Sequence, residues 1–178
     1  MMMLRWRVAH PIALSGPLAV VLVSTLACSP RRADPPAPAT ALRDALIQLA
    51  RGEGDLAALT VTFDHLDAFH GGFRLTIRGD GTIQQQAVRT EVGDPRDKVT
   101  PNDLKELVTR LVKHEAWAQR IDERQPVPDE SRATLETCYG DECVEIWEWY
   151  NDLEKNARIG DVLKSMQAIA WKPTAPSG

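Results

Sequence analysis

Two short segments, residues 133–139 and 142–150, constrain the fold most, because they hold two of the three cysteines of the chain. Both have the composition of β-strands, and Gly140-Asp141 between them suits a two-residue turn whose first central residue has a positive φ. Such a turn places Cys138 opposite Cys143 at a non-hydrogen-bonded pair, where Cα atoms lie about 4.5 Å apart. A disulfide can span that distance. We therefore predict a β-hairpin that is cross-linked by Cys138 and Cys143.

Residues 59–64 and 73–78 alternate between apolar and polar side chains, which is typical of half-buried strands. Gly79-Asp80-Gly81 follows the second segment as a turn. A three-residue loop here places Ile83 opposite Ile77 on the buried face, whereas a two-residue turn would place Ile83 opposite an arginine. The three-residue loop is therefore the predicted one.

Three segments have apolar residues at helical spacing: residues 40–51, 100–112 and 158–171. The second has the clearest start, because Thr100 suits the N-cap position and Asp103 completes a capping box. Its apolar stripe should lie on the sheet, since an amphipathic helix buries its apolar face against another element.

The order of these segments predicts an α+β domain over residues 40–172. We expect an antiparallel sheet of about five strands, with two or three helices packed mainly on one face. The length suits one domain rather than two. Residues 173–178 are rich in proline and glycine and are expected to form a flexible tail.

Residues 1–27 have the three parts of a secretory signal: a basic start, an apolar middle and small residues before the cleavage point. The unbroken apolar run, residues 18–23, is far shorter than the ~20 residues that a membrane-spanning helix needs. The sequence that ends at Cys28, STLAC, resembles the lipobox of bacterial lipoproteins, although Thr25 stands where leucine is usual. The alternative is an ordinary cleaved signal that leaves Cys28 as a free thiol.

The lipobox resemblance implies that Cys28 is acylated and holds the protein on a membrane. Ser29 after the cysteine implies the outer membrane, with the domain facing the periplasm. Residues 28–39 contain four prolines and are expected to form an extended linker. In this oxidising compartment Cys138 and Cys143 remain as an even pair, as a disulfide requires.

Charge excludes one class of partner. Without residues 1–27 the chain has 19 Lys and Arg against 25 Asp and Glu, a net charge near −6. Nucleic acids bind to basic surfaces, so we expect no nucleic-acid partner.

The layout of residues 59–169 resembles a class of uncharacterised bacterial envelope lipoprotein domains. The resemblance rests on residues 77–83, IRGDGTI, and residues 100–108, TPNDLKELV. Members of that class often have cysteines near the first strand loop, where this chain has Phe69, His70 and two glycines. The resemblance implies the fold and no activity.

The hairpin register that joins the cysteines also places Glu136 opposite Glu145, with Trp147 and Trp149 on the same face. Two facing carboxylates can divide acid and base roles, as in glycoside hydrolysis, but a solvated sheet face is the simpler interpretation. The tryptophans are either core under a helix, the interpretation we favour, or the anchor of a contact surface. The four residues form the candidate binding face.

His65, Asp67 and His70 lie close together in sequence, but their spacing matches no established zinc motif. We therefore expect a polar loop there, and neither a metal nor a cofactor. The serines at Ser131 and Ser165 are not in a nucleophile elbow.

The sequence predicts a lipid-anchored envelope protein that binds a protein or a glycan through a sheet face or edge. One alternative is an envelope hydrolase that uses Glu136 and Glu145. The other is a structural lipoprotein without a small ligand.

Overall fold

The computed structural model describes residues 38–67, 70–120, 125 and 127–173. These belong to the second of two units of the chain, Pro35–Gly178. The predicted signal peptide, Cys28 and the linker up to residue 37 lie outside the described residues, as do residues 174–178 of the predicted tail. The predicted boundary between linker and domain is wrong by two residues, because residues 38 and 39 belong to the first helix.

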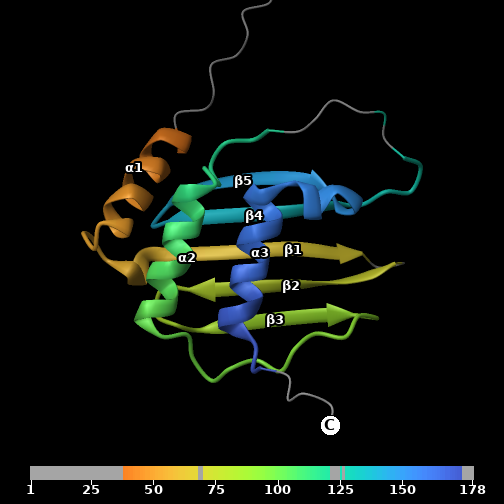
Figure 1. Ribbon diagram of the computed structural model, residues 1–178, viewed down its shortest axis with the longest axis horizontal. Coiled ribbons are helices and arrows are strands. Elements are labelled where there is room, and N and C mark those ends of the chain that lie inside the picture. Colours follow the sequence, from red (N-terminus) through yellow and green to blue (C-terminus); the bar gives the residue numbers. More distant parts are fainter. Residues whose placement is uncertain (1–37, 68–69, 121–124, 126, 174–178) are drawn as a thin grey trace, which may run out of the picture. The chain divides into compact units, whose positions relative to one another are not determined.

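The fold is α+β, built on one antiparallel sheet of five strands (Figure 1). The strands are β1 (Leu59–Asp67), β2 (Gly71–Arg78), β3 (Ile83–Val88), β4 (Arg132–Tyr139) and β5 (Glu142–Trp149). Their order across the sheet is β3-β2-β1-β4-β5, so the first strand lies in the centre. Two local hairpin systems are therefore joined by the pairing of β1 with β4.

Both predicted turns are confirmed. Ile83 pairs with Ile77, and Gly81 has a φ of 88° in the three-residue loop. In the last hairpin Gly140 has a φ of 61°, and Cys138 lies opposite Cys143. The two cysteines form the predicted disulfide, with their Cα atoms 4.1 Å apart.

Three α-helices lie on the same face of the sheet (Figure 1). They are α1 (Pro38–Ala50), α2 (Pro101–Lys113) and α3 (Ala157–Ala170), and the short 3₁₀ helices η1 (Leu56–Ala58) and η2 (Tyr150–Lys155) precede β1 and α3. The predicted capping box of α2 is present: the Asp103 backbone N–H donates to the Thr100 hydroxyl at 3.2 Å, and the Thr100 N–H donates to the Asp103 carboxylate at 3.3 Å. In α3 the side chain of Asn156 caps the first turn by accepting from the Arg158 N–H.

The core fills the space between the three helices and one face of the sheet. Its largest fully buried side chains are Phe63, Leu42, Leu46, Leu59, Leu75, Ile77, Leu107, Leu111, Leu135, Ile159, Met166 and Val61. Burial on the sheet alternates along β1, where every second residue from Leu59 to His65 is buried. Alternation of this kind means that one face of the sheet carries the core and the other does not.

Candidate functional site

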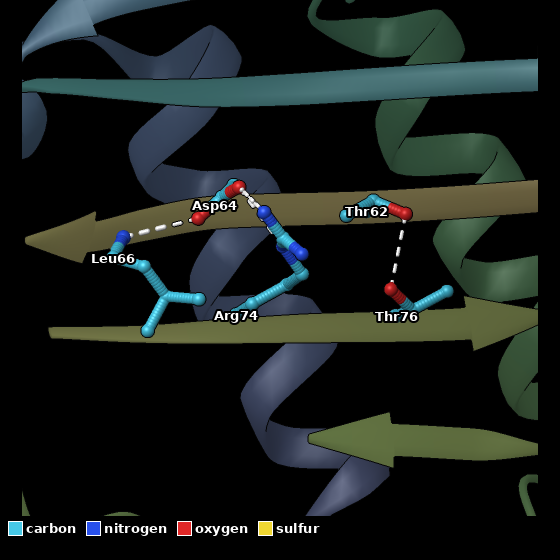
Figure 2. Close-up of polar contacts among 5 residues, drawn as sticks. All are labelled: Thr62, Asp64, Leu66, Arg74 and Thr76. Atoms are coloured by element: carbon cyan, nitrogen blue, oxygen red, sulfur yellow. Dashed lines mark hydrogen bonds and ion pairs between the residues drawn. The ribbon is translucent and has the colours of Figure 1, made fainter. Parts of the chain in front are cut away.

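The second face of the sheet, which we call the open face, has no α-helix over it among the described residues (Figure 1). Register assigns its side chains, because residues paired across strands point to the same side. The open face includes Arg74, Thr76, Thr62, Asp64, Glu136, Glu145, Trp147 and Trp149. The helices lie behind the sheet when this face is viewed in Figure 2.

The interpretation of Trp147 and Trp149 as core under a helix is wrong. Ile146 and Leu135, which point the other way, are buried beneath the helices, whereas both tryptophans are half-buried on the open face. Strand β5 is apolar on both faces, so its pattern alone could not decide which side the helices cover.

The centre of the open face is occupied by short polar contacts, shown in Figure 2. The Arg74 guanidinium pairs with the Asp64 carboxylate, which also accepts from the Leu66 backbone N–H at 3.0 Å. Beside this pair the hydroxyls of Thr62 and Thr76 are 3.1 Å apart. These polar groups are paired or hydrogen-bonded with one another. The end of the open face that carries Trp147 and Trp149 is therefore the more distinctive part.

That end carries a tryptophan–arginine cluster made of Trp147, Trp149 and Arg132. The two indole rings meet edge to face, with centroids 5.3 Å apart and planes at 86°. The Arg132 guanidinium lies 4.0 Å from the Trp147 ring centroid and 5.1 Å from the Trp149 ring centroid. A guanidinium within about 6 Å of an indole face is attracted by the ring quadrupole. Arg132 was missed in the sequence, although the hairpin register places it opposite Trp149.

The edge of the sheet beside this cluster is occupied by Gln119. Its side-chain amide donates to the Trp147 carbonyl at 2.9 Å and accepts from the Trp147 N–H at 2.7 Å. The next outward N–H, that of Trp149, donates to the Glu148 carboxylate at 2.8 Å. The side chains thus take the place of a neighbouring strand along this part of β5.

Glu136 and Glu145 lie directly opposite each other, as predicted, and both are exposed. The Glu136 carboxylate and the sulfur atoms of Cys138 and Cys143 lie within 4.8 Å of one another. Because the two sulfur atoms are joined in a disulfide, they are not thiolate ligands for a metal ion. Neither glutamate lines the two cavities described next.

A polar cavity of about 830 Å³ lies between the end of α2, strand β5 and the start of α3. Its lining includes Glu148, which is only 6 % exposed and accepts a 2.7 Å hydrogen bond from the Asn156 side chain. It also includes His114, whose pKa is lowered because burial disfavours the charged ring, although Asp161 opposes the shift. Glu115 pairs there with Arg120 at 2.8 Å and with Arg158 at 3.4 Å. Sequence reasoning missed this cavity, because its walls come from three separate segments.

The prediction that His65, Asp67 and His70 share a polar loop is wrong: His65 and Asp67 lie in β1, and His70 lies in the turn before β2. The His70 ring lies 3.3 Å from the Asp67 carboxylate. The His65 ring points instead to the helix side, where its Nε2 atom is 2.7 Å from the Ser131 hydroxyl. The three side chains do not converge on one point, so the described residues form no metal site here.

His65 and Ser131 line a second cavity, of about 230 Å³, together with Tyr150 and Asn151. Tyr150 stacks on His65 with ring centroids 3.7 Å apart and planes at 8°. Burial lowers the pKa of His65, and the carboxylates of Asp67 and Asp64 only partly oppose that shift. The two partners are 66 residues apart, so no local pattern brings them together.

Comparisons with known proteins identify no relative. No family model matches the chain, and neither the curated proteins nor the solved structures contain a match. Among the described residues, no helix has both the length and the apolar character needed to cross a membrane.

Proposed function

We propose that this chain is a lipid-anchored cell-envelope protein that binds a protein partner through the tryptophan–arginine cluster of its open face. The observation that carries this proposal is the contact of the exposed Arg132 with the half-buried Trp147 and Trp149, on a sheet face that has no helix over it among the described residues. Tryptophan and arginine are among the residues most enriched at the energetic centres of protein interfaces.

The ring geometry favours a protein over a glycan as the partner. The two indole planes are nearly perpendicular, so they do not form a flat platform on which successive sugar rings could stack. Arg132 also lies over the Trp147 ring. An arginine that is already held against aromatic rings loses less conformational freedom when a partner covers it, which favours a protein contact.

Binding by the face is favoured over strand addition at the edge. Gln119 and Glu148 already occupy the outward backbone groups of Trp147 and the outward N–H of Trp149. A partner strand would have to displace these hydrogen bonds before it could pair with this part of β5.

The proposed location rests on the signal-like residues 1–27 and the lipobox-like sequence at Cys28. The Cys138–Cys143 disulfide supports an oxidising compartment. Residues 28–37, which precede α1, would reach about 31 Å in an extended polyproline-like form, at ~3.1 Å per residue. The partner would therefore lie on or near the membrane that holds the lipid.

The test is site-specific photo-crosslinking of the full chain in its native membrane. A photoreactive amino acid at Glu145, beside the cluster, should give one discrete protein adduct, and the same probe at Lys105 on the exposed side of α2 should give none. Trp147→Ala should abolish the adduct, because it removes a central aromatic contact. The matched control Gln86→Ala, on an exposed site of β3, should keep it.

The folded state of each variant is checked by the Cys138–Cys143 disulfide and by thermal unfolding. An adduct that persists in a folded Trp147→Ala chain would contradict the proposal. If the protein instead co-sediments with purified cell-wall polysaccharide, and Trp147→Ala abolishes this binding, the partner is a glycan and not a protein. Absence of both adduct and co-sedimentation would favour a structural lipoprotein.

A further inference from the structure

The pair formed by His65 and Ser131 has the geometry of a base beside a nucleophile. The Ser131 Oγ and His65 Nε2 atoms are 2.7 Å apart, within the range in which a histidine can accept a hydroxyl proton. Both residues line the cavity of about 230 Å³, so a molecule in that cavity would lie next to the pair. Neither residue takes part in the tryptophan–arginine cluster.

Both side chains are held in place by their surroundings. His65 is 7 % exposed and its ring is covered by Tyr150, which fixes the ring plane. The backbone of Ser131, just before β4, accepts a 3.1 Å hydrogen bond from the Tyr150 N–H. Burial lowers the pKa of His65, so the ring is neutral at pH 7 and has a lone pair for the hydroxyl proton.

We propose that Ser131 and His65 form a nucleophile–base pair that hydrolyses esters of short acyl groups. The size of the cavity sets the acyl length, because about 230 Å³ is smaller than the usual range of ~300 to 1,000 Å³ for drug-sized ligands. The acidic residues Asp129 and Glu130 are among those that line the cavity, so uncharged or cationic esters fit better than anionic ones. Asn151 also lines the cavity, and an asparagine side-chain amide is a group that can donate to a developing oxyanion.

The reaction balances with water as the second substrate. The Ser131 oxygen bonds to the acyl carbon while its proton passes to His65 Nε2. The ester C–O bond then breaks, and the alcohol leaves with that proton. Water attacks the acyl-serine, gives its proton to His65, and releases the carboxylic acid as the proton returns to Ser131.

One feature differs from a catalytic triad. The second ring nitrogen of His65, Nδ1, is buried and has no hydrogen-bond partner among the described residues. In the described part of the chain, no carboxylate therefore accepts a hydrogen bond from the imidazolium: Asp67 and Asp64 favour the charged ring only through space, and Asp64 is engaged by Arg74 on the open face. Turnover should be slow for this reason, so covalent labelling of the serine is a sharper measurement than steady-state hydrolysis.

The experiment treats the full chain, in detergent, with a fluorophosphonate that phosphonylates activated serines. We expect one labelled residue, Ser131, identified by peptide mass. His65→Gln should slow labelling by about 100-fold or more, the usual contribution of a general base. The labelling rate of the unmodified protein should be half-maximal below pH 6.5, because His65 titrates below its ordinary pKa.

The controls are Ser165→Ala and His114→Gln, which lie outside this cavity and should keep the label, and Ser131→Ala, which should lose it. Should His65→Gln not fold, Ser131→Cys provides a second measurement, alkylation by iodoacetamide. Its rate should be half-maximal well below the ordinary thiol pKa of about 8.5. Labelling at another residue, no labelling of the folded protein, equal rates with and without His65, or an ordinary thiol profile would each overturn the proposal.

Discussion

His65 and His114 show how burial sets the charge of single residues in this protein. Each is largely buried, and each has a pKa below the ordinary value because a buried imidazolium loses its hydration. Around His114, Asp161 favours the charged ring, whereas Lys113, Arg110 and Arg158 disfavour it. Both rings are therefore neutral in the folded chain at pH 7 and become charged more readily once the chain unfolds.

A loss of stability in mild acid follows from this difference. The unfolded chain binds protons at these histidines near pH 6.5, before the folded chain does, so the free energy of unfolding is greatest above pH 6.5 and falls as the pH drops below it. In urea unfolding at pH 7.5 and 5.5, His114→Gln should reduce the difference between the two pH values. Gln86→Ala, at an exposed site without a titratable group, should leave it unchanged. An equal loss in the His114→Gln variant would show that other groups cause the acid sensitivity.

In the last hairpin, β4–β5, two pairs of facing residues have opposite effects on stability. Strands β4 and β5 place two cysteines opposite each other, and then two glutamates two residues further on. The disulfide closes a loop of only a few residues, so it should stabilise by less than the typical ~2 to 4 kcal/mol and serve mainly to fix register. Facing like charges are unfavourable, so the glutamates reduce the stability of the same hairpin.

Glu136→Gln combined with Glu145→Gln should raise the free energy of unfolding by about 0.2 to 1 kcal/mol, because it removes this repulsion. Chemical denaturation at low ionic strength measures the change, which should shrink as salt is added. Glu142→Gln is the matched control, since Glu142 faces Tyr139 and should have no such effect. A lower stability in the double variant would instead indicate that the two carboxylates jointly bind a cation. Loss of an envelope phenotype in a stable double variant would revive the alternative hydrolase.

At the scale of the whole molecule, the α+β class, the five strands and both hairpin registers were predictable, because turn residues and alternation are local signals. The strand order was not, since no local pattern indicates that β1 pairs with β4. The same limit applies to the sites. The two tryptophans were found from one strand, and Arg132 follows from the hairpin register. The contact between His65 and Ser131 depends on the pairing of distant strands.

The anchor is also a prediction about the whole molecule, and intact mass spectrometry of the non-reduced protein from its native membrane tests it. The mass should correspond to a chain that begins at Cys28, carries acyl groups and has lost two hydrogens in the disulfide. A mass that includes residues 1–27, or lacks acyl groups, would contradict the lipid anchor. Reduced cysteines at Cys138 and Cys143 would contradict the oxidising compartment.

The Gln119 side chain also matters for how many copies of this protein can share one surface. An edge strand with unpaired backbone groups can act as a template for another copy and so begin a fibrillar aggregate. Gln119 forms hydrogen bonds with both the N–H and the carbonyl of Trp147, so these groups of β5 are not available to a strand of another copy. Copies held close together by the proposed lipid anchor could then remain separate, and the tryptophans would be available to a partner rather than to one another.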